Sequence, residues 1–170
     1  MKNIILIGMP GCGKSTVGVV LAKTIGYRFL DSDLLIQETD GRLLSEIIEQ
    51  DGLEGFNSIE NRINSQIRVD KTVIATGGSV VYGREAMEHL RNIGVVVYIS
   101  LSYEEIEKRL GDLTKRGVSI KKGQTLRELY DERLPLYEKY ADLIITEENK
   151  NISETALYIR DKIKALMKED

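Results

Sequence analysis

Cysteine is nearly absent from this sequence, since Cys12 is the only one among 170 residues. An intrachain disulfide is therefore excluded, which is typical of a protein in a reducing compartment. Long apolar runs are absent as well. The apolar run after the opening Met-Lys-Asn is too short for a signal peptide, and no run approaches the ~20 residues of a membrane span. These absences favour a cytoplasmic protein with no membrane partner.

Proline and net charge are also scarce. Two prolines leave no Pro-rich linker, and the chain shows neither internal repeats nor low-complexity tracts. The 24 basic residues nearly balance the 27 acidic ones, and the net charge of −3 provides no general attraction to nucleic acid. A chain of this length can bury one well-formed core. We predict a single domain, residues 1–170, that functions as a monomer.

What the sequence does contain is a phosphate-binding motif near its start. The stretch 8–15 reads Gly-Met-Pro-Gly-Cys-Gly-Lys-Ser and matches the pattern G-x-x-x-x-G-K-[ST]. It follows an apolar run at 4–7 that predicts a buried strand, and it opens a helix-period stretch at 16–25. Backbone N–H groups of such a loop bind phosphate oxygens. The alternative is a Gly-rich turn followed by a capping serine, but a chance match is rare.

This motif predicts the nucleotide site, with Gly11, Cys12, Gly13, Lys14, Ser15 and Thr16 as its binding residues. Lys14 would contact the β- and γ-phosphates as a catalytic residue, and the Ser15 hydroxyl would ligate Mg²⁺. Cys12 occupies a variable position of the loop. We interpret it as a small filler residue rather than a nucleophile.

Strand-like and helix-like segments alternate along the rest of the chain. The predicted strands are Ile4–Ile7, Arg28–Leu30, Thr72–Ala75, Val95–Ile99 and Leu143–Ile145. The predicted helices lie near 16–25, 43–50, 57–68, 84–92, 103–110, 124–138 and 153–167. Val/Ile-rich strands that alternate with helices indicate an α/β fold with a parallel sheet covered on both faces.

Two stretches show no regular periodicity, 51–55 and 111–123. The second is bounded by glycines, and its basic residues are Lys115, Arg116, Lys121 and Lys122. A basic loop between glycines is suited to closing over bound phosphates. We therefore predict a lid at about 111–123, and the alternative is a solvated run of charges.

Two carboxylates follow the second predicted strand, in Phe29-Leu30-Asp31-Ser32-Asp33. This places Asp31 and Asp33 near the carboxyl edge of the sheet, where open α/β folds bind their ligands. One carboxylate could orient Mg²⁺ through its water shell, and the other could accept a proton from an attacking hydroxyl. The alternative is a solvated turn in which Asp33 caps the next helix.

With these motifs in place, the chain resembles the shikimate kinases, small enzymes with a phosphate loop that transfer the γ-phosphoryl group of ATP to a hydroxyl of shikimate. The resemblance covers nearly the whole chain, and the order and spacing of its parts are specific. Those parts are Gly8 to Thr16, Asp31-Ser32-Asp33, Gly52 through Phe56 to Glu60, Gly77-Gly78, Arg109, Arg116 and the stretch Arg133-Leu-Pro-Leu-Tyr.

The resemblance implies a P-loop nucleoside-triphosphate-binding fold with a five-stranded parallel sheet flanked by helices. It also implies a substrate-binding subdomain at about 33–62 and a short closing lid. By matching position, Asp31 would hold the hydrated Mg²⁺, and Asp33 would bind the acceptor hydroxyl as the candidate catalytic base. Gly77 and Gly78 would offer backbone N–H groups to the substrate.

Three arginines take roles from the same resemblance. Arg116 would reach from the lid to the phosphates as a catalytic residue, and Arg109 would stack near the adenine. Arg133 would pair with the substrate carboxylate. Without the resemblance, Arg133 would be interpreted as a charge on the surface of a helix.

The chain also departs from the family pattern. Asn57 stands where the family has an arginine that clamps the shikimate carboxylate, and the loss of one charge-assisted hydrogen bond, ~1.5–3 kcal/mol, would weaken binding roughly 10- to 150-fold. Glu60 lies on the same helix face and would lose its arginine partner. An unpaired Glu60 in the substrate site would repel a carboxylate. Ser79 replaces a third glycine, and Gly117 replaces a proline.

The sequence therefore predicts an ATP- and Mg²⁺-dependent kinase for a small hydroxylated metabolite, with shikimate as the leading acceptor. The nearest alternative is the same fold and chemistry acting on a sugar acid or an amino alcohol, because of Asn57. A nucleotide kinase would also fit the size. A switch GTPase is disfavoured, because the stretch 149–152 lacks the aspartate of the guanine-reading motif. A non-catalytic nucleotide-binding protein would require the loss of a central catalytic group, and none is lost.

Overall fold

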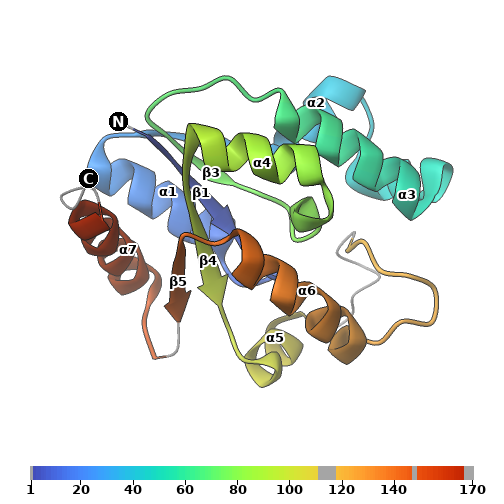
Figure 1. The fold of residues 1–170 in the computed structure, drawn as a ribbon. Helices are drawn as coiled ribbons and strands as arrows, with labels where there is room; N and C mark the ends of the chain where they lie inside the picture. Colours follow the sequence, from blue (N-terminus) through green and yellow to red (C-terminus); the bar gives the residue numbers. More distant parts are fainter. Residues whose placement is uncertain (1, 111–117, 147–148, 167–170) are drawn as a thin grey trace.

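A single parallel sheet organises the computed structural model, which describes residues 2–110, 118–146 and 149–166 (Figure 1). Its strands are β1 Asn3–Ile7, β2 Arg28–Asp31, β3 Thr72–Ala75, β4 Gly94–Ser100 and β5 Leu143–Thr146. They are arranged in the order β2-β3-β1-β4-β5, and all four pairings are parallel. The predicted five-stranded parallel sheet is confirmed, and each predicted strand is correct to within one residue at either end.

The central strands are buried on both faces, as their continuous apolar sequences require. Every residue of β1 and β3 is buried. The register places Ile5 of β1 opposite Ile74 of β3 and Val96 of β4, and all three side chains are fully inaccessible to solvent. This β-branched layer forms the centre of the main core.

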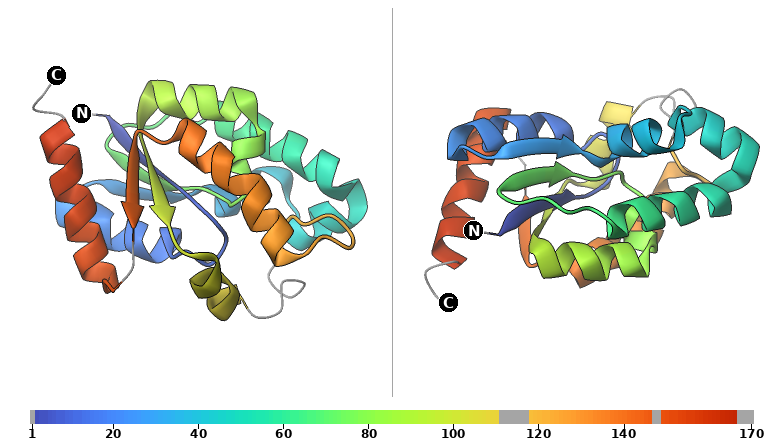
Figure 2. Two further views of the ribbon diagram at one scale, coloured as in Figure 1. Left: turned by 60° about the horizontal axis from the view of Figure 1, so that its bottom comes forward. Right: turned by 90° about the horizontal axis from the view of Figure 1, so that it is seen from above.

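Helices cover both faces of the sheet. They are α1 Lys14–Ile25, α2 Ser32–Asp40, α3 Leu44–Ser65, α4 Arg84–Ile93, α5 Tyr103–Leu110, α6 Leu126–Tyr140 and α7 Ile152–Leu166, with a short 3₁₀ helix η1 at Val80–Tyr82. The views in Figure 2 place α1 and α4 on opposite faces of the sheet. Helix α7 packs against α1, while α3 packs against α4 and both α4 and α6 contact β4. No helix among the described residues is long and apolar enough to cross a bilayer.

The region after β2 differs from the prediction in two ways. Helix α2 was not predicted, and the two helices predicted at 43–50 and 57–68 form one interrupted element, α3. The irregular stretch predicted at 51–55 reduces to Gly52, whose backbone at φ 72° and ψ 179° interrupts an otherwise helical run. A small second core lies between α2 and α3 and consists of Ile36, Ile47, Phe56 and Ile63.

The fold brings the segments after β1, β2 and β3 to one edge of the sheet, because parallel strands share the direction of their carboxyl ends. Thr76, directly after β3, fixes two of these segments together. Both its backbone N–H and its hydroxyl donate to the carbonyl oxygen of Leu6, at 3.2 and 2.8 Å. The glycines that follow Thr76 are thereby held beside the loop that follows β1.

Candidate active site

The phosphate loop curls because its three glycines adopt backbone conformations that other residues rarely take, and the first of them, Gly8, has φ 149°. Gly11 has φ 76°, and Gly13, the N-cap of α1, has φ 90°. A Cβ on Gly11 would also lie 3.1 Å from Cδ2 of Leu110, at the end of α5. The loop leads directly into the N-terminus of α1, whose free backbone N–H groups and positive dipole end favour an anion.

Lys14 lies inside this curl and is only 7% exposed. Its Nζ donates to the carbonyl oxygens of Gly8 and Met9, at 2.8 and 2.9 Å. The neighbouring Cys12 is fully buried, with its Sγ 3.6 Å from the same Nζ, and therefore occupies the filler position expected for it. The ammonium group is thus held where the loop can present it to bound phosphates.

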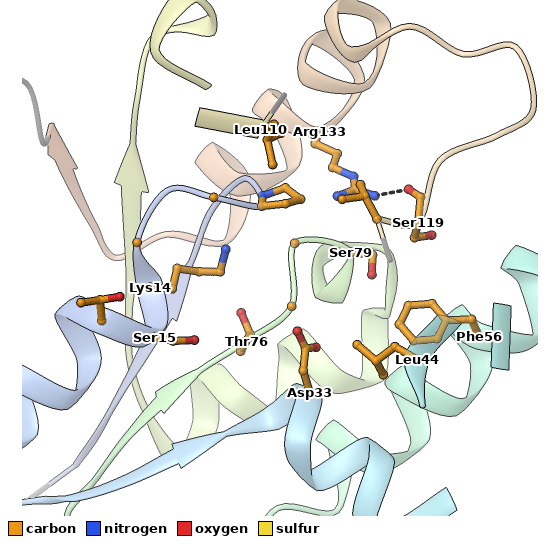
Figure 3. Close-up of a pocket in the computed structure, with 17 residues that line it drawn as sticks. Lys14, Ser15, Asp33, Leu44, Phe56, Thr76, Ser79, Leu110, Ser119 and Arg133 are labelled. Atoms are coloured by element: carbon orange, nitrogen blue, oxygen red, sulfur yellow. Dashed lines mark hydrogen bonds between the residues drawn. The ribbon is translucent and has the colours of Figure 1, made fainter. Parts of the chain in front are cut away.

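A pocket of about 320 Å³ opens beside the loop (Figure 3). Its lining combines segments that are far apart in the sequence: the phosphate loop, Asp33 after β2, the segment 76–79 after β3, and Arg133 on α6. Leu44 and Phe56 from α3 line it as well. Figure 3 shows the side chains of Lys14, Asp33 and Arg133 entering this space from different elements.

Ser15, at the start of α1, and Asp31, at the end of β2, form a polar pair. The Ser15 hydroxyl donates to Oδ2 of Asp31 at 2.8 Å, while Oδ1 of Asp31 accepts from the backbone N–H groups of Asp33 and Leu34 at 2.9 and 3.3 Å. Mg²⁺ is commonly held by one or two protein oxygens together with waters and phosphate oxygens. The pair supplies such oxygens next to the phosphate loop, and so its chemistry fits that ion.

Asp33 faces the pocket and does not cap a helix. The N-cap of α2 is Asp31, and therefore the alternative in which Asp33 is the cap is wrong. Burial raises the pKa of the Asp33 carboxyl, and the nearby Asp31 charge raises it further, while Lys14 acts in the opposite direction. A carboxyl with a raised pKa at the edge of a pocket is suited to binding a hydroxyl and accepting its proton.

The two glycines after β3 are required by close packing. A Cβ on Gly77 would lie 2.6 Å from Oδ1 of Asp33 and 2.8 Å from Oε2 of Glu60. A Cβ on Gly78 would lie 2.7 Å from Cδ of Pro10 and 3.0 Å from Nη1 of Arg133. Both positions therefore exclude any side chain, and among the described residues neither glycine donates its backbone N–H to another residue.

Arg133 enters the pocket from α6 and is only 1% exposed. Its Nη2 donates to the carbonyl oxygen of Ser119 at 2.6 Å, and its Nε donates to the Tyr82 hydroxyl at 3.3 Å. The guanidinium also lies over the Tyr82 ring, 5.3 Å from the centroid. The alternative of a charge on the helix surface is therefore wrong. Sequence reasoning did not identify Tyr82 or Ser119, because nothing local to either marks its contact with Arg133.

Glu60 and Asn57 lie behind the pocket lining. Glu60 is 2% exposed, and its Oε1 accepts a hydrogen bond of 2.6 Å from the Ser79 hydroxyl. The sequence pattern left Glu60 without a partner, and the structure provides Ser79. Asn57 lines an adjoining cavity of about 350 Å³, which shares Ser119 with the main pocket. The Oδ1 of Asn57 is buried and has no partner among the described residues.

Of the two other arginines predicted for the site, Arg109 and Arg116, the structure describes only Arg109. Arg109 lies at the end of α5 beside the phosphate loop, where its Cβ is 3.9 Å from the position of a Cβ on Gly11, and its Nε contacts Oε1 of Glu105 at 3.0 Å. Arg116 lies outside the described residues, as does the part of the predicted lid at 111–117. The remainder of that segment contributes Val118 and Ser119 to the pocket.

A phosphate loop, a hydroxyl–carboxylate pair for a hard cation, a buried carboxyl and a buried arginine around one small pocket define a P-loop phosphotransferase for small molecules. Comparison with known proteins identifies its family. The family model described as shikimate kinase matches residues 10–164. The chain belongs to the shikimate kinase family.

Individual relatives agree with this assignment. The shikimate kinase of Synechococcus sp. (strain RCC307) is 37% identical over 98% of this chain and 86% of its own length. That of Thermodesulfovibrio yellowstonii is 39% identical over 92% of this chain and 91% of its own. Among solved structures, shikimate kinase from Acinetobacter baumannii in complex with shikimate has a TM-score of 0.89 at 32% identity, and the match covers 97% of this chain and 94% of that one.

Proposed function

We propose that this protein transfers the γ-phosphoryl group of ATP to a hydroxyl of shikimate, giving shikimate 3-phosphate. The observation that carries the proposal is that Asp33 and Arg133 both line one pocket beside the phosphate loop. A carboxyl that binds a hydroxyl and a cation that binds a carboxylate suit the two ends of a small hydroxy acid. The relative of known structure from Acinetobacter baumannii, with shikimate bound, supports this acceptor.

The phosphate loop and Lys14 bind the triphosphate. Phosphoryl transfer passes through a loose transition state, and so the protein accelerates it mainly by positioning the reactants and neutralising charge on the transferring group. Among the described cations, Lys14 is our candidate for neutralising this charge, because the carbonyl oxygens of Gly8 and Met9 hold it inside the loop. Arg116 and Arg109 remain our candidates for contacts to the phosphates and to the adenine, respectively.

Ser15 and Asp31 would hold Mg²⁺, Ser15 directly and Asp31 through water. The ion, when bound, neutralises charge on the β- and γ-phosphate oxygens. The two side chains already meet at 2.8 Å, at the end of β2 and the start of α1. This contact beside the phosphate loop supports the proposal that the two side chains share one hard cation.

Asp33 orients the acceptor hydroxyl and accepts its proton. Its burial favours the protonated form, which makes the carboxyl a better proton acceptor than an exposed aspartate. Gly77 and Gly78 offer their backbone N–H groups to the same acceptor. Arg133 pairs with the acceptor carboxylate, because its guanidinium is already oriented by Ser119 and Tyr82.

A second candidate function is the same reaction on another hydroxylated acceptor, which the absence of an arginine at position 57 favours. Assays of ADP release over shikimate, sugar acids, amino alcohols and nucleoside monophosphates test both. We expect shikimate to have the highest kcat/KM. Undetectable turnover of shikimate, with efficient phosphorylation of another acceptor, would reject shikimate and retain the kinase. Our predictions of a monomer and of a cytoplasmic location can be checked by light scattering and by cell fractionation.

A further inference from the structure

The carboxyl of Glu60 is held by a hydroxyl instead of a cation. Its Oε1 accepts from Ser79 at 2.6 Å, and Ser79 is itself buried. Its Oε2 is buried and has no hydrogen-bond partner among the described residues. The resemblance to the family leads us to expect a glycine at position 79 and an arginine at position 57, where this chain has Ser79 and Asn57.

The groups that face Glu60 come from several elements. Asp33 on α2 meets it across Gly77, because Oδ1 of Asp33 and Oε2 of Glu60 both lie within 3 Å of the position of a Cβ on that glycine. Arg133 on α6 and Lys14 on α1 act on Glu60 from a greater distance, and none of the described ion pairs includes Glu60. On its own helix, Asn64 donates to the backbone carbonyl of Glu60 at 2.9 Å, not to its carboxyl.

An ionised Glu60 would therefore be a buried charge with one hydrogen bond and a second carboxyl nearby, which is costly. The pKa of Glu60 is raised to about 7, chiefly by burial. The Ser79 hydrogen bond opposes this rise, the Asp33 charge adds to it, and the Arg133 and Lys14 charges oppose it. The Ser79 hydrogen bond is the largest effect that stabilises the ionised form, and the charges of Arg133 and Lys14 add to it. Both cations are residues that would be neutralised when their anionic ligands bind.

We propose that Ser79 is a positioning residue that holds Glu60 in place of the missing arginine, and that Glu60 takes up a proton from solvent when an acceptor bearing a carboxylate binds at Arg133. The inference rests on the proposed function for the identity of that acceptor. Pairing of the acceptor carboxylate with Arg133 cancels a charge that favours ionised Glu60, so that the proton affinity of Glu60 rises. Because such coupling is reciprocal, a protonated Glu60 strengthens binding of the acceptor.

The coupling predicts how KM depends on pH. In the wild type, KM for shikimate should be low where Glu60 is protonated and should rise by about threefold or more between roughly pH 6 and pH 8. Glu60→Gln, which cannot ionise, should lack this rise. Calorimetry in two buffers that differ in ionisation enthalpy should show net proton uptake on shikimate binding to the wild type and less to Glu60→Gln. Absence of that difference would overturn the coupling.

The role of Ser79 has its own signature. Ser79→Ala removes the donor that favours ionised Glu60, and so the midpoint of the pH profile should move upward by about one unit or more, since a hydrogen bond to a charged group is worth ~1.5–3 kcal/mol. Ser58→Ala on the exposed face of α3 and Glu49→Gln are matched controls and should leave the midpoint in place. A purely structural Ser79 would change KM or stability without moving the midpoint, and that result would overturn the assignment.

An infrared titration of the free protein separates this inference from the proposed function. The protonated-carboxyl band that is present in the wild type and absent in Glu60→Gln should disappear as the pH rises through neutrality, and at a higher pH in Ser79→Ala. Ionised Glu60 throughout about pH 5 to 9 would overturn the inference whatever the acceptor is. If calorimetry detected no shikimate binding while this titration behaved as expected, the proposed acceptor would be rejected and the Ser79–Glu60 pair retained.

Discussion

The Oδ1 atom of Asp31 accepts a hydrogen bond of 2.9 Å from the backbone N–H of Asp33, and this contact separates the roles of the two carboxylates. Asp31 caps helix α2 and, through Oδ2, contacts Ser15. Asp33 makes no capping contact and turns its carboxyl into the pocket. The helix that Asp31 begins is thus what places Asp33 two residues further on beside Gly77.

Asp33→Asn should therefore reduce kcat by a large factor, about 100-fold or more, because general base catalysis typically contributes 10²–10⁴-fold. The amide keeps the shape of the side chain but cannot accept the proton. We expect little change in ATP affinity or in the free energy of unfolding. Steady-state kinetics and denaturant unfolding measure these quantities, and a variant with wild-type kcat would remove Asp33 from the mechanism.

Asp31→Ala is the matched comparison for that experiment. It removes the N-cap of α2, and helix caps contribute about 1 kcal/mol, so that stability should fall by about this amount. The Mg²⁺ concentration needed for half-maximal rate should rise as well, because the proposed water-mediated ligand is lost. A variant that lost neither stability nor affinity for Mg²⁺ would contradict the division of roles between the two aspartates.

Lys14→Met should abolish most of the transfer to any acceptor. The methionine side chain is similar in length but carries no charge, and loss of one charge-assisted contact to the transferring phosphoryl group should lower kcat by about 100-fold or more. Circular dichroism should show an intact fold, since the main core does not include Lys14. Turnover within a few-fold of the wild type would show that the loop acts through its backbone N–H groups alone.

Arg133→Lys should raise KM for shikimate and leave KM for ATP nearly unchanged. Lysine keeps the charge but loses the planar fork that donates to Ser119 and Tyr82 while presenting a third nitrogen to the pocket. We expect an increase of about tenfold or more, as for one charge-assisted hydrogen bond. Arg127→Lys on the exposed part of the same helix is the control, and equal effects of the two changes would argue against a carboxylate site at Arg133.

The stability of the protein should depend on the ionisation of Glu60. Its pKa in the folded protein, about 7, lies above the ordinary value of 4.5. The stabilisation that belongs to the protonated form is therefore fully present below pH 4.5 and is lost as the pH rises through about 7. Glu60→Gln should lack this loss, which is on the order of 3 kcal/mol for a shift of this size. Urea unfolding of both proteins at about pH 5 and pH 8 measures the difference, and parallel pH dependence would contradict it.

The sequence predicts the strands well because their signal is local. Thr72–Ala75 is a continuous β-branched and apolar run between polar residues, and it forms β3 with the predicted limits. Helix α2 was missed for two reasons. Leu34 is 63% exposed, so that the apolar residues of this helix do not mark one face. The N-cap of the helix, Asp31, was interpreted as a metal-binding residue and not as a helix start. Gly52 interrupts α3, but the residues on either side of it are helical, so that the predicted irregular stretch at 51–55 is shorter than expected.

The same distinction applies to the site. The phosphate loop and the pair Asp31 and Asp33 lie within short motifs, and their geometry follows from the strand-to-helix turn that carries them. The contacts that set the substrate end of the pocket join distant positions instead. Ser79 and Glu60 are 19 residues apart, and Arg133 reaches Ser119 across 14 residues. No local pattern encodes such a contact, and only the packing of α3 and α6 around Gly77 and Gly78 reveals it.

The last prediction restores the family pattern at both positions where this chain departs from it. Asn57→Arg should offer Glu60 a cation and the acceptor a second carboxylate-binding group, lowering KM for shikimate by about tenfold or more. Ser79→Gly removes the competing hydroxyl, and so the double variant should gain more than the sum of the two single changes, as expected for residues that share one partner.

A double-mutant cycle of KM and of the Glu60 titration measures this coupling. The paired arginine should also lower the pKa of Glu60 from about 7 toward its ordinary range, because an opposite charge at short distance stabilises the ionised form. Ser58→Arg, one residue further along α3 on an exposed position, controls for a general effect of added positive charge. Strictly additive changes, or a Glu60 that titrates as in the wild type, would show that the pocket has been rebuilt in a way that the two substitutions do not reverse.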